Sequence, residues 1–503
     1  MFHENIHDKR WSRLAYIALA LLAAIFFDVF FNNRQLGLGW FVFVFVFIYA
    51  FLALAFITNQ LRQKLALLLT LPILILSFDV VLYNNALVKM AVPWVVFILS
   101  VLLFVLATLH NPAGYKFKLL NIPVLRNFAL WFGKMVLVYK DLSQSNSVPS
   151  KNYKKIATAL LIAFPILLLF GVLFYSADRI FADLLDNVFK INITPAAVGR
   201  VLRGFVIFVF LSGLFYATLS REHSLLEYVN KVKAHDNFIA SIVLGLINAL
   251  FLLFVIIQIK YLFGSSEFVL QNGLTYAKYA RQGFFQLVGV LVISFALLFY
   301  VYRSYCAHNG ARLMGFLQLF LSAQVCLVAL SALKRMNLYQ DAYGFTVLRL
   351  YVEWFIYLVI LVQAIYFIAV IFKVEFRRLF GLYLVLGLLA FTLVASLNVD
   401  KIIARKNVDR MIAGEQKNLD LSYLLSGLSV DALPEIKRAF DRGFTKEQVS
   451  YSKFYTNDED FPKDFAGAAF KYKYNLLKIL SSDASWVEFN FGREEAKKLL
   501  KIN

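Results

Sequence analysis

Tyr, Arg and Asp side chains gather where several long apolar stretches of the sequence end, and these residue types suit ligand binding. The set comprises Asp178, Tyr276, Tyr279, Arg281, Arg335, Tyr339, Asp341, Tyr343 and Arg349. Arg can hold a phosphate or carboxylate through two parallel hydrogen bonds, and Tyr offers an apolar ring with a hydroxyl. One interpretation is a ligand site for an anionic group. The alternative is an aromatic and basic belt that ties a soluble segment to a membrane core.

A weak internal repeat supplies two further candidates, Asp28 and Asp79. Each Asp lies between Phe and Val near the end of an apolar stretch, and each is followed by an Asn pair and then by Trp40 or Trp94. The pattern predicts two hairpins of one design. The two carboxylates could face one another and bind an ion or proton. Alternatively, each Asp could bond to its own turn while each Trp anchors at the membrane interface.

Arg349 and Glu353 are four residues apart inside an apolar stretch. On a helix this spacing places both side chains on one face, about 6 Å apart along the axis. An isolated charge in hydrocarbon costs at least about 2.5 kcal/mol, so the spacing predicts a pair. The pair could be structural, or it could form part of a gate or ligand clamp.

The sequence provides no catalytic set, metal site or cofactor site that we can identify. Its two cysteines, Cys306 and Cys326, do not have the spacing of a metal or redox pair. We therefore predict no cofactor and favour a non-enzymatic role. A membrane transferase acting on a lipid-linked substrate remains an alternative, because Asp28 follows the first apolar stretch as an acidic residue does in such enzymes.

The composition requires an apolar solvent around most of these residues. The chain has 503 residues, of which 61% are apolar and only 16% are charged, whereas soluble domains are about half apolar and a quarter charged. We therefore predict an all-α, multispan membrane protein. Apolar runs long enough to cross about 30 Å of hydrocarbon give about eleven spans. They are Leu14–Phe31, Leu38–Ile57, Leu65–Tyr83, Ala91–Leu109, Ile156–Tyr175, Val201–Leu219, Phe238–Ile259, Phe284–Tyr302, Leu313–Ala332, Phe345–Phe372 and Leu379–Ser396.

The distribution of Lys and Arg among the loops predicts the orientation. With a cytoplasmic N-terminus, the inner loops carry 21 of these residues and the outer loops 11, and cytoplasmic loops are the ones enriched in positive charge. This predicts a cytoplasmic N-terminus and an extracytoplasmic C-terminus. The net charge of +20 is then explained by topology, and no motif for nucleic-acid binding is present.

Four regions follow from this organisation. Residues 1–109 form a four-span hairpin repeat, and 110–155 form a cytoplasmic loop. Its middle mixes apolar and basic residues, as in a helix lying on anionic lipid, although the loop could instead dock a cytoplasmic protein. Residues 156–396 form a seven-span core. Residues 397–503 form a small all-α tail domain in which Asn398 caps one helix and Ser429 another.

Several motifs resemble a family of bacterial multispan membrane proteins catalogued only as a domain of unknown function. They include Arg335-Met336-Asn337-Leu338-Tyr339, Ala342-Tyr343-Gly344-Phe345-Thr346 and Tyr276-Ala277 with Tyr279-Ala280-Arg281. The similarity runs from about the fifth span into the tail. It implies the fold and a location in the bacterial inner membrane, and it implies no substrate.

Three classes of function are compatible with these features. The tail lacks His and Cys, which favours an assembly or sensing component that presents the tail to an extracytoplasmic protein partner. The span count and the repeat are also compatible with a transporter of a small or anionic substrate, and the lipid-linked transferase is the third class. We expect membrane lipids, anionic at the cytoplasmic face, as partners, and no nucleic acid.

Overall fold

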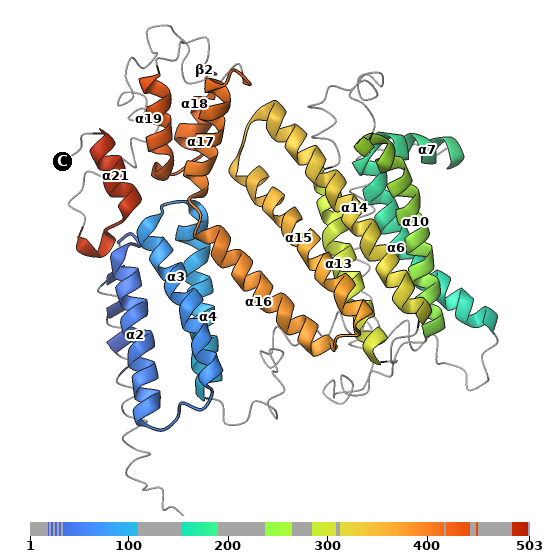
Figure 1. Cartoon of the computed structure of the whole chain (residues 1–503), viewed down its shortest axis with the longest axis horizontal. Helices are drawn as coiled ribbons and strands as arrows, with labels where there is room; N and C mark the ends of the chain where they lie inside the picture. Colours follow the sequence, from blue (N-terminus) through green and yellow to red (C-terminus); the bar gives the residue numbers. More distant parts are fainter. Residues whose placement is uncertain are drawn as a thin grey trace, which may run out of the picture. The chain divides into compact units, whose positions relative to one another are not determined.

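The structure is a computed structural model, and it is built almost entirely from helices (Figure 1). It describes residues 34–108, 152–189, 237–263, 284–307, 312–416, 419–442, 449–450 and 485–500, together with single residues between 19 and 31. All statements below refer to these residues.

Seven helices are long and apolar enough to cross a membrane. They are α2 (Leu38–Ile57), η1 with α3 (Lys64–Leu69 and Thr70–Leu82), η2 with α4 (Leu87–Ala91 and Val92–Thr108), α10 (Asn237–Phe263), α14 (Arg312–Tyr343), α15 (Val347–Ile371) and α16 (Phe376–Ala395). Each coincides with a predicted span, so a multispan helical membrane protein is confirmed.

The other four predicted spans have different outcomes. Helices α6 (Asn152–Ala177) and α13 (Phe284–Ala307) occupy two of them, and the apolar helical stretches among their described residues are Ile166–Ala177 and Gln286–Tyr302. The predicted span 201–219 and most of 14–31 lie outside the described residues. The total of about eleven therefore remains a prediction.

The chain divides into two compact units. Unit 1 contains residues 1–116, 344–350 and 384–503, and unit 2 contains residues 117–343 and 351–383. The N-terminal spans and the tail thus belong to one unit, a grouping that the order of residues along the chain does not predict.

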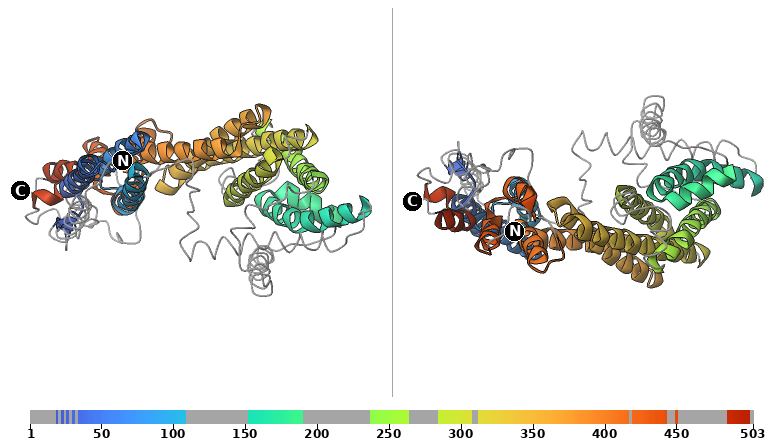
Figure 2. Two further views of the ribbon diagram at one scale, coloured as in Figure 1. Left: turned by 90° about the horizontal axis from the view of Figure 1, so that it is seen from below. Right: turned by 90° about the horizontal axis from the view of Figure 1, so that it is seen from above.

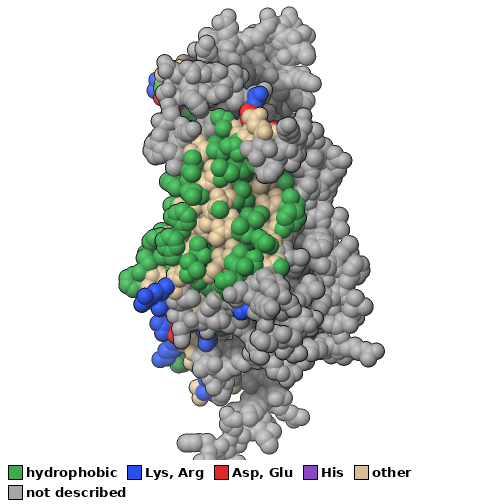
Figure 3. All heavy atoms as spheres, turned by 90° about the vertical axis from the view of Figure 1, so that its right-hand side faces the viewer, with side chains coloured by type: hydrophobic (Ala, Val, Ile, Leu, Met, Phe, Trp, Pro, Cys, Tyr) green, Lys and Arg blue, Asp and Glu red, His purple; other side chains and the backbone are tan. Residues whose placement is uncertain are grey.

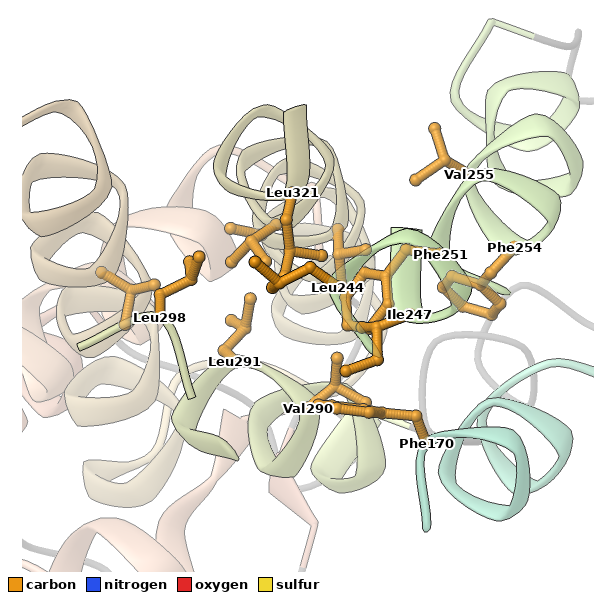
Figure 4. Close-up of a cluster of buried hydrophobic side chains, with 14 of the residues drawn as sticks. Phe170, Leu244, Ile247, Phe251, Phe254, Val255, Val290, Leu291, Leu298 and Leu321 are labelled. Carbon is orange, nitrogen blue, oxygen red and sulfur yellow. The ribbon is translucent and has the colours of Figure 1, made fainter. Parts of the chain in front are cut away.

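Unit 2 is a helical bundle with an aromatic and aliphatic core. Helix α10 packs against α6 and α14, and α13 packs against the same two helices (Figure 2). Phe170, Ile247, Phe251 and Leu321 point into the space between them (Figure 4). The ring of Phe170 meets that of Phe251 edge to face at a centroid distance of 4.9 Å, a favoured aromatic geometry.

The outside of this bundle is apolar too. On α6, Ile156, Leu160, Phe164 and Leu168 are all exposed, and their spacing of four residues aligns them on one side of the helix. Figure 3 shows hydrophobic side chains across the middle of the face that carries these helices, with Lys and Arg below them. An exposed apolar band of this kind belongs against lipid rather than water.

Unit 1 contains the hairpins and the tail helices. Helices α2, α3 and α4 pack together around side chains such as Ile48, Ile73 and Leu103. The tail contributes α17 (Val399–Ile412), α18 (Leu421–Ser426), η4 (Val430–Ala432), α19 (Leu433–Asp441), η7 (Trp486–Glu488) and α21 (Phe491–Leu500).

The tail helices begin where the capping residues predict. The Asn398 side chain accepts the backbone N–H of Lys401 at 3.1 Å, and Ser429 caps η4, which leads directly into α19. Gly414, just after α17, has a φ of 74°, which suits glycine at a helix end. One difference from an all-α tail is a two-residue parallel pairing of β1 (Leu419–Asp420) with β2 (Val449–Ser450).

Candidate functional site

The turn between α3 and η2 is bonded to the tail. The backbone N–H of Asn84 donates to the Asp431 carboxylate at 2.6 Å, and its side-chain amide donates to Asn490 Oδ1 at 2.7 Å. In return, Asn490 Nδ2 donates to the carbonyls of Val80 and Tyr83 at 3.0 and 3.2 Å. Asn490 therefore satisfies the last carbonyls of α3, which have no partner within their own helix.

Two cationic side chains, Lys89 and Arg493, lie beside the same turn and donate to carbonyl oxygens. Lys89 Nζ donates to the carbonyls of Leu36 and Val80 at 2.8 and 2.7 Å. Arg493 donates to the carbonyls of Glu488 and Leu36 at 3.2 and 3.4 Å and to Asn84 Oδ1 at 3.3 Å. We call Asn84, Lys89, Asp431, Asn490 and Arg493 the turn network.

Burial shifts the pKa values of the two tail groups in the turn network. Removal from water raises the pKa of Asp431 to about 6; the bond from Asn84 N–H and the charge of Lys89 oppose this rise, and Asp400 adds to it. Burial likewise lowers the pKa of Arg493, while Glu488 and Asp431 oppose the change. Unfavourable desolvation is the dominant effect on both tail groups.

A second attachment joins the tail to the start of α2. Leu38 N–H donates to the Phe489 carbonyl at 2.9 Å, and Gln35 N–H donates to Glu488 Oε1 at 2.8 Å. A Cβ atom on Gly37 would lie 2.5 Å from the Phe489 oxygen, and one on Gly39 would lie 2.3 Å from Val487 Cγ1. Only glycine allows the tail backbone to approach this closely.

A third attachment holds the loop between α14 and α15. Asn407 on α17 brackets Phe345, because its Oδ1 accepts the Phe345 N–H at 2.8 Å and its Nδ2 donates to the Phe345 carbonyl at 2.9 Å. Val347 N–H donates to the Tyr423 hydroxyl at 2.9 Å. Gly344 has a φ of 74°, and a Cβ there would lie 2.7 Å from Asn407 Oδ1. This loop and the tail form one contiguous part of unit 1.

The structure describes Asp79, one of the two predicted carboxylates of the repeat. Asp79 is buried and accepts the Ser396 hydroxyl at 2.8 Å, so its partner is at the end of α16 rather than in its own turn. Asp28 lies outside the described residues. The two Trp residues also have different surroundings, because Trp40 is 7% exposed and Trp94 is 68% exposed.

In unit 2, two of the predicted ligand residues form a buried ion pair. Arg335 Nη2 is 2.6 Å from Asp178 Oδ2, and both side chains are 2% exposed or less. Arg335 also donates to the Ala177 carbonyl at 2.8 Å and to Gln258 at 3.2 Å. The second Asp178 oxygen accepts the backbone N–H groups of Ile180 and Phe181 and so begins α7 (Arg179–Phe189).

This environment differs from the wet membrane boundary expected for Arg335 and Asp178. A buried guanidinium and carboxylate with this many bonds neutralise one another and fix the junction of α6 and α7. The geometry therefore favours the structural interpretation for these two residues over an exposed anion site.

The remaining predicted site residues are more dispersed. Tyr339 and Tyr343 meet edge to face at 5.2 Å, and Asp341 is exposed. Arg349 donates to the Gly344 carbonyl at 2.6 Å, while Glu353 accepts Gln340 Nε2 at 2.8 Å. Coupling of Arg349 with Glu353 remains a prediction. Tyr276, Tyr279 and Arg281 lie outside the described residues.

The arrangement can bind and position segments, but it offers no set of groups for metal chemistry. Within the ranges that the structure describes, no group of three His, Cys, Asp or Glu residues could hold a metal ion.

The sequence did not identify Asn407, Asp431 and Asn490 as residues that attach the tail. The closely spaced Gly37 and Gly39 were an available signal of a close backbone approach.

A family model described as a domain of unknown function, DUF4153, matches residues 65–439. The chain belongs to this family. A search of curated proteins and a search of solved structures each found no match.

Proposed function

We propose that this member of the family is an assembly or sensing component whose tail is fixed to its membrane helices and presented to a protein partner. The observation that carries the proposal is the attachment of the tail at three places: the turn after α3, the start of α2 and the α14–α15 loop. A tail attached so firmly can transmit the binding of a partner to the helices that it holds.

The outer sides of the tail helices offer a polar surface for such a partner. Arg405 and Asp409 on α17 are exposed, as is Asp441 on α19. Arg438 joins the two helices by donating to Asp409 at 2.6 Å. A mixed-charge surface on a rigid support suits a regulated protein contact.

We further propose a location in the bacterial inner membrane, with the N-terminus in the cytoplasm and the tail outside. Two features support the orientation, and the second builds on the first. The loop charges favour it, and the α3–η2 turn and the α14–α15 loop, both predicted to be extracytoplasmic, are bonded to the tail. The basic loop 110–155 would then contact anionic lipid at the cytoplasmic face.

Reporter fusions test this orientation. Fusions after Lys64, Ser145 and Glu222 should report a cytoplasmic location, and fusions after Gly264 and Asn503 an extracytoplasmic one. A cytoplasmic signal at Asn503 would contradict the proposed topology.

The assembly role is tested by releasing the tail without disturbing membrane insertion. Asn84→Ala combined with Asn490→Ala removes reciprocal bonds of the turn network. We expect normal membrane levels, faster proteolysis between Ser396 and Gly427, and loss of complementation in a deletion strain. Lys498→Ala, an exposed change on α21 outside the cleaved interval, serves as the control for proteolysis. Full complementation by a variant whose tail is demonstrably released would contradict the role.

A further inference from the structure

Helix α14 carries a row of buried polar residues through unit 2. Gln318, Ser322, Gln324, Ser331 and Arg335 are each 2% exposed or less. At 1.5 Å per residue, the row extends about 25 Å, which is most of the hydrocarbon thickness of a bilayer. The polar row is independent of the tail and of its proposed role.

Several members of the row have side-chain partners on neighbouring helices. Gln318 Oε1 accepts the Tyr366 hydroxyl at 2.6 Å, and Ser322 donates to Gln363 at 2.8 Å. Ser331 donates to Gln258 at 2.6 Å. These bonds show that the bundle satisfies buried polar groups where it can, as expected for a membrane interior.

Asn248 on α10 and Gln324 on α14 are exceptions, because part of each side chain has no hydrogen-bond partner. The Asn248 amide nitrogen donates to the carbonyls of Leu244 and Leu317 at 2.8 and 3.1 Å, and Gln324 Nε2 donates to the Asn248 carbonyl at 3.2 Å. These donor bonds define which end of each amide is the oxygen. The two side-chain oxygens, Asn248 Oδ1 and Gln324 Oε1, are buried and have no hydrogen-bond donor among the described residues.

A neutral molecule with a hydrogen-bond donor suits these two unpartnered side-chain oxygens better than a cation does. Between Leu244 and Gln258 on α10, and between Leu317 and Ser331 on α14, the sequence contains no Asp, Glu, Lys, Arg or His. A cation held there would lack a compensating negative charge, so its desolvation would be expensive. A neutral molecule avoids that cost.

We propose that Asn248 and Gln324 form an internal hydration site between α10 and α14. Water supplies O–H donors that these buried oxygens lack, and each bond removes the cost of an unsatisfied buried acceptor. Water at this position would hydrate part of the buried polar row of α14 inside unit 2.

X-ray hydroxyl-radical footprinting of the full-length protein in lipid nanodiscs tests the site, because bound water generates radicals beside the side chains that it touches. Leu321 is fully buried and lies one turn from both Leu317 and Gln324. After correction for intrinsic reactivity, we expect Leu321 to be labelled several-fold more than Phe170, which is equally buried among aromatic rings.

Matched variants identify the source of the label. Gln324→Met should reduce Leu321 labelling to the level of Phe170. Ser322→Ala combined with Gln363→Met should leave it unchanged, because that double change removes both partners of an existing bond and leaves neither unsatisfied. Leu321 labelling no greater than that of Phe170 in the wild-type protein would overturn the proposal. Persistent Leu321 labelling in a folded Gln324→Met variant would overturn it as well. The wild-type comparison decides even if that variant does not fold.

Discussion

Asp431 shows how a single buried group can govern the attachment of the tail. It accepts the Asn84 N–H at 2.6 Å, yet burial raises its pKa to about 6. Because this value exceeds the ordinary carboxyl value, the folded protein takes up a proton near pH 6 that the unfolded chain does not. The contribution of Asp431 to stability is therefore larger at pH 5 than at pH 7.5.

We predict that unit 1 becomes more stable as pH falls from 7.5 to 5, by about 1.4 kcal/mol from this group alone. Asp431→Asn keeps an oxygen for the Asn84 N–H and removes the titration, so it should flatten the pH dependence and raise stability at pH 7.5. Thermal unfolding in nanodiscs measures both effects. Asp441→Asn, at an exposed position, is the control, and equal pH slopes in the two variants would refute the assignment.

Arg335 and Asp178 provide a second prediction for individual residues. Arg335→Leu leaves a buried carboxylate without its cation and should cost about 3–5 kcal/mol. Adding Asp178→Asn should recover part of that loss, because Asn can still accept the N–H groups at the start of α7. A double-mutant cycle on unfolding measures the recovery. Additive losses would show that the pair is not coupled.

Arg335→Lys should also lower the stability of unit 2, because an ammonium cannot reproduce the planar set of bonds.

At the scale of elements, local signals predicted the helices well and their partners poorly. Asn398 and Ser429 predicted the starts of two tail segments because a cap bonds to residues two or three positions away. Asn84 could be assigned only to a turn, since its partners Asp431 and Asn490 lie more than 340 residues further along the chain. Arg335 was placed at a wet surface because its sequence position does not reveal that Asp178 covers it.

The start of α2 gives a prediction for an element. Gly39→Val adds a side chain where a Cβ already meets Val487 Cγ1, so the segment around η7 should leave α2 while α2 itself stays helical. Faster hydrogen exchange at the backbone N–H of Leu38, which bonds to Phe489, measures this release. Gly387→Val on α16, where a Cβ would meet nothing within 4 Å, is the control. Unchanged protection of Leu38 in Gly39→Val would contradict the contact.

At the scale of the whole molecule, the apolar composition was sufficient to predict a multispan helical protein. It was insufficient to predict that residues 384–503 form a compact unit with residues 1–116. Apolar runs and loop charges report on each segment's relation to the membrane, whereas this grouping depends on contacts between distant segments. The tail contacts arise from Asn, Gly and backbone carbonyls, which hydropathy does not register.

The central claim is that the tail is fixed to the N-terminal helices, and cysteine crosslinking in native membranes tests it most directly. Leu38→Cys and Phe489→Cys would be combined in a chain whose Cys306 and Cys326 are replaced by Ser, with a protease site inserted in the 110–155 loop. These two residues are joined through their backbones at 2.9 Å, so the replacements leave the side chains of the turn network intact. After treatment with a short thiol-reactive crosslinker and cleavage, we predict that most N-terminal fragments remain joined to the C-terminal fragment, whereas a control pair at 38 and 441 yields separate fragments. Separation of the fragments with the 38 and 489 pair, at full thiol modification, would contradict the account.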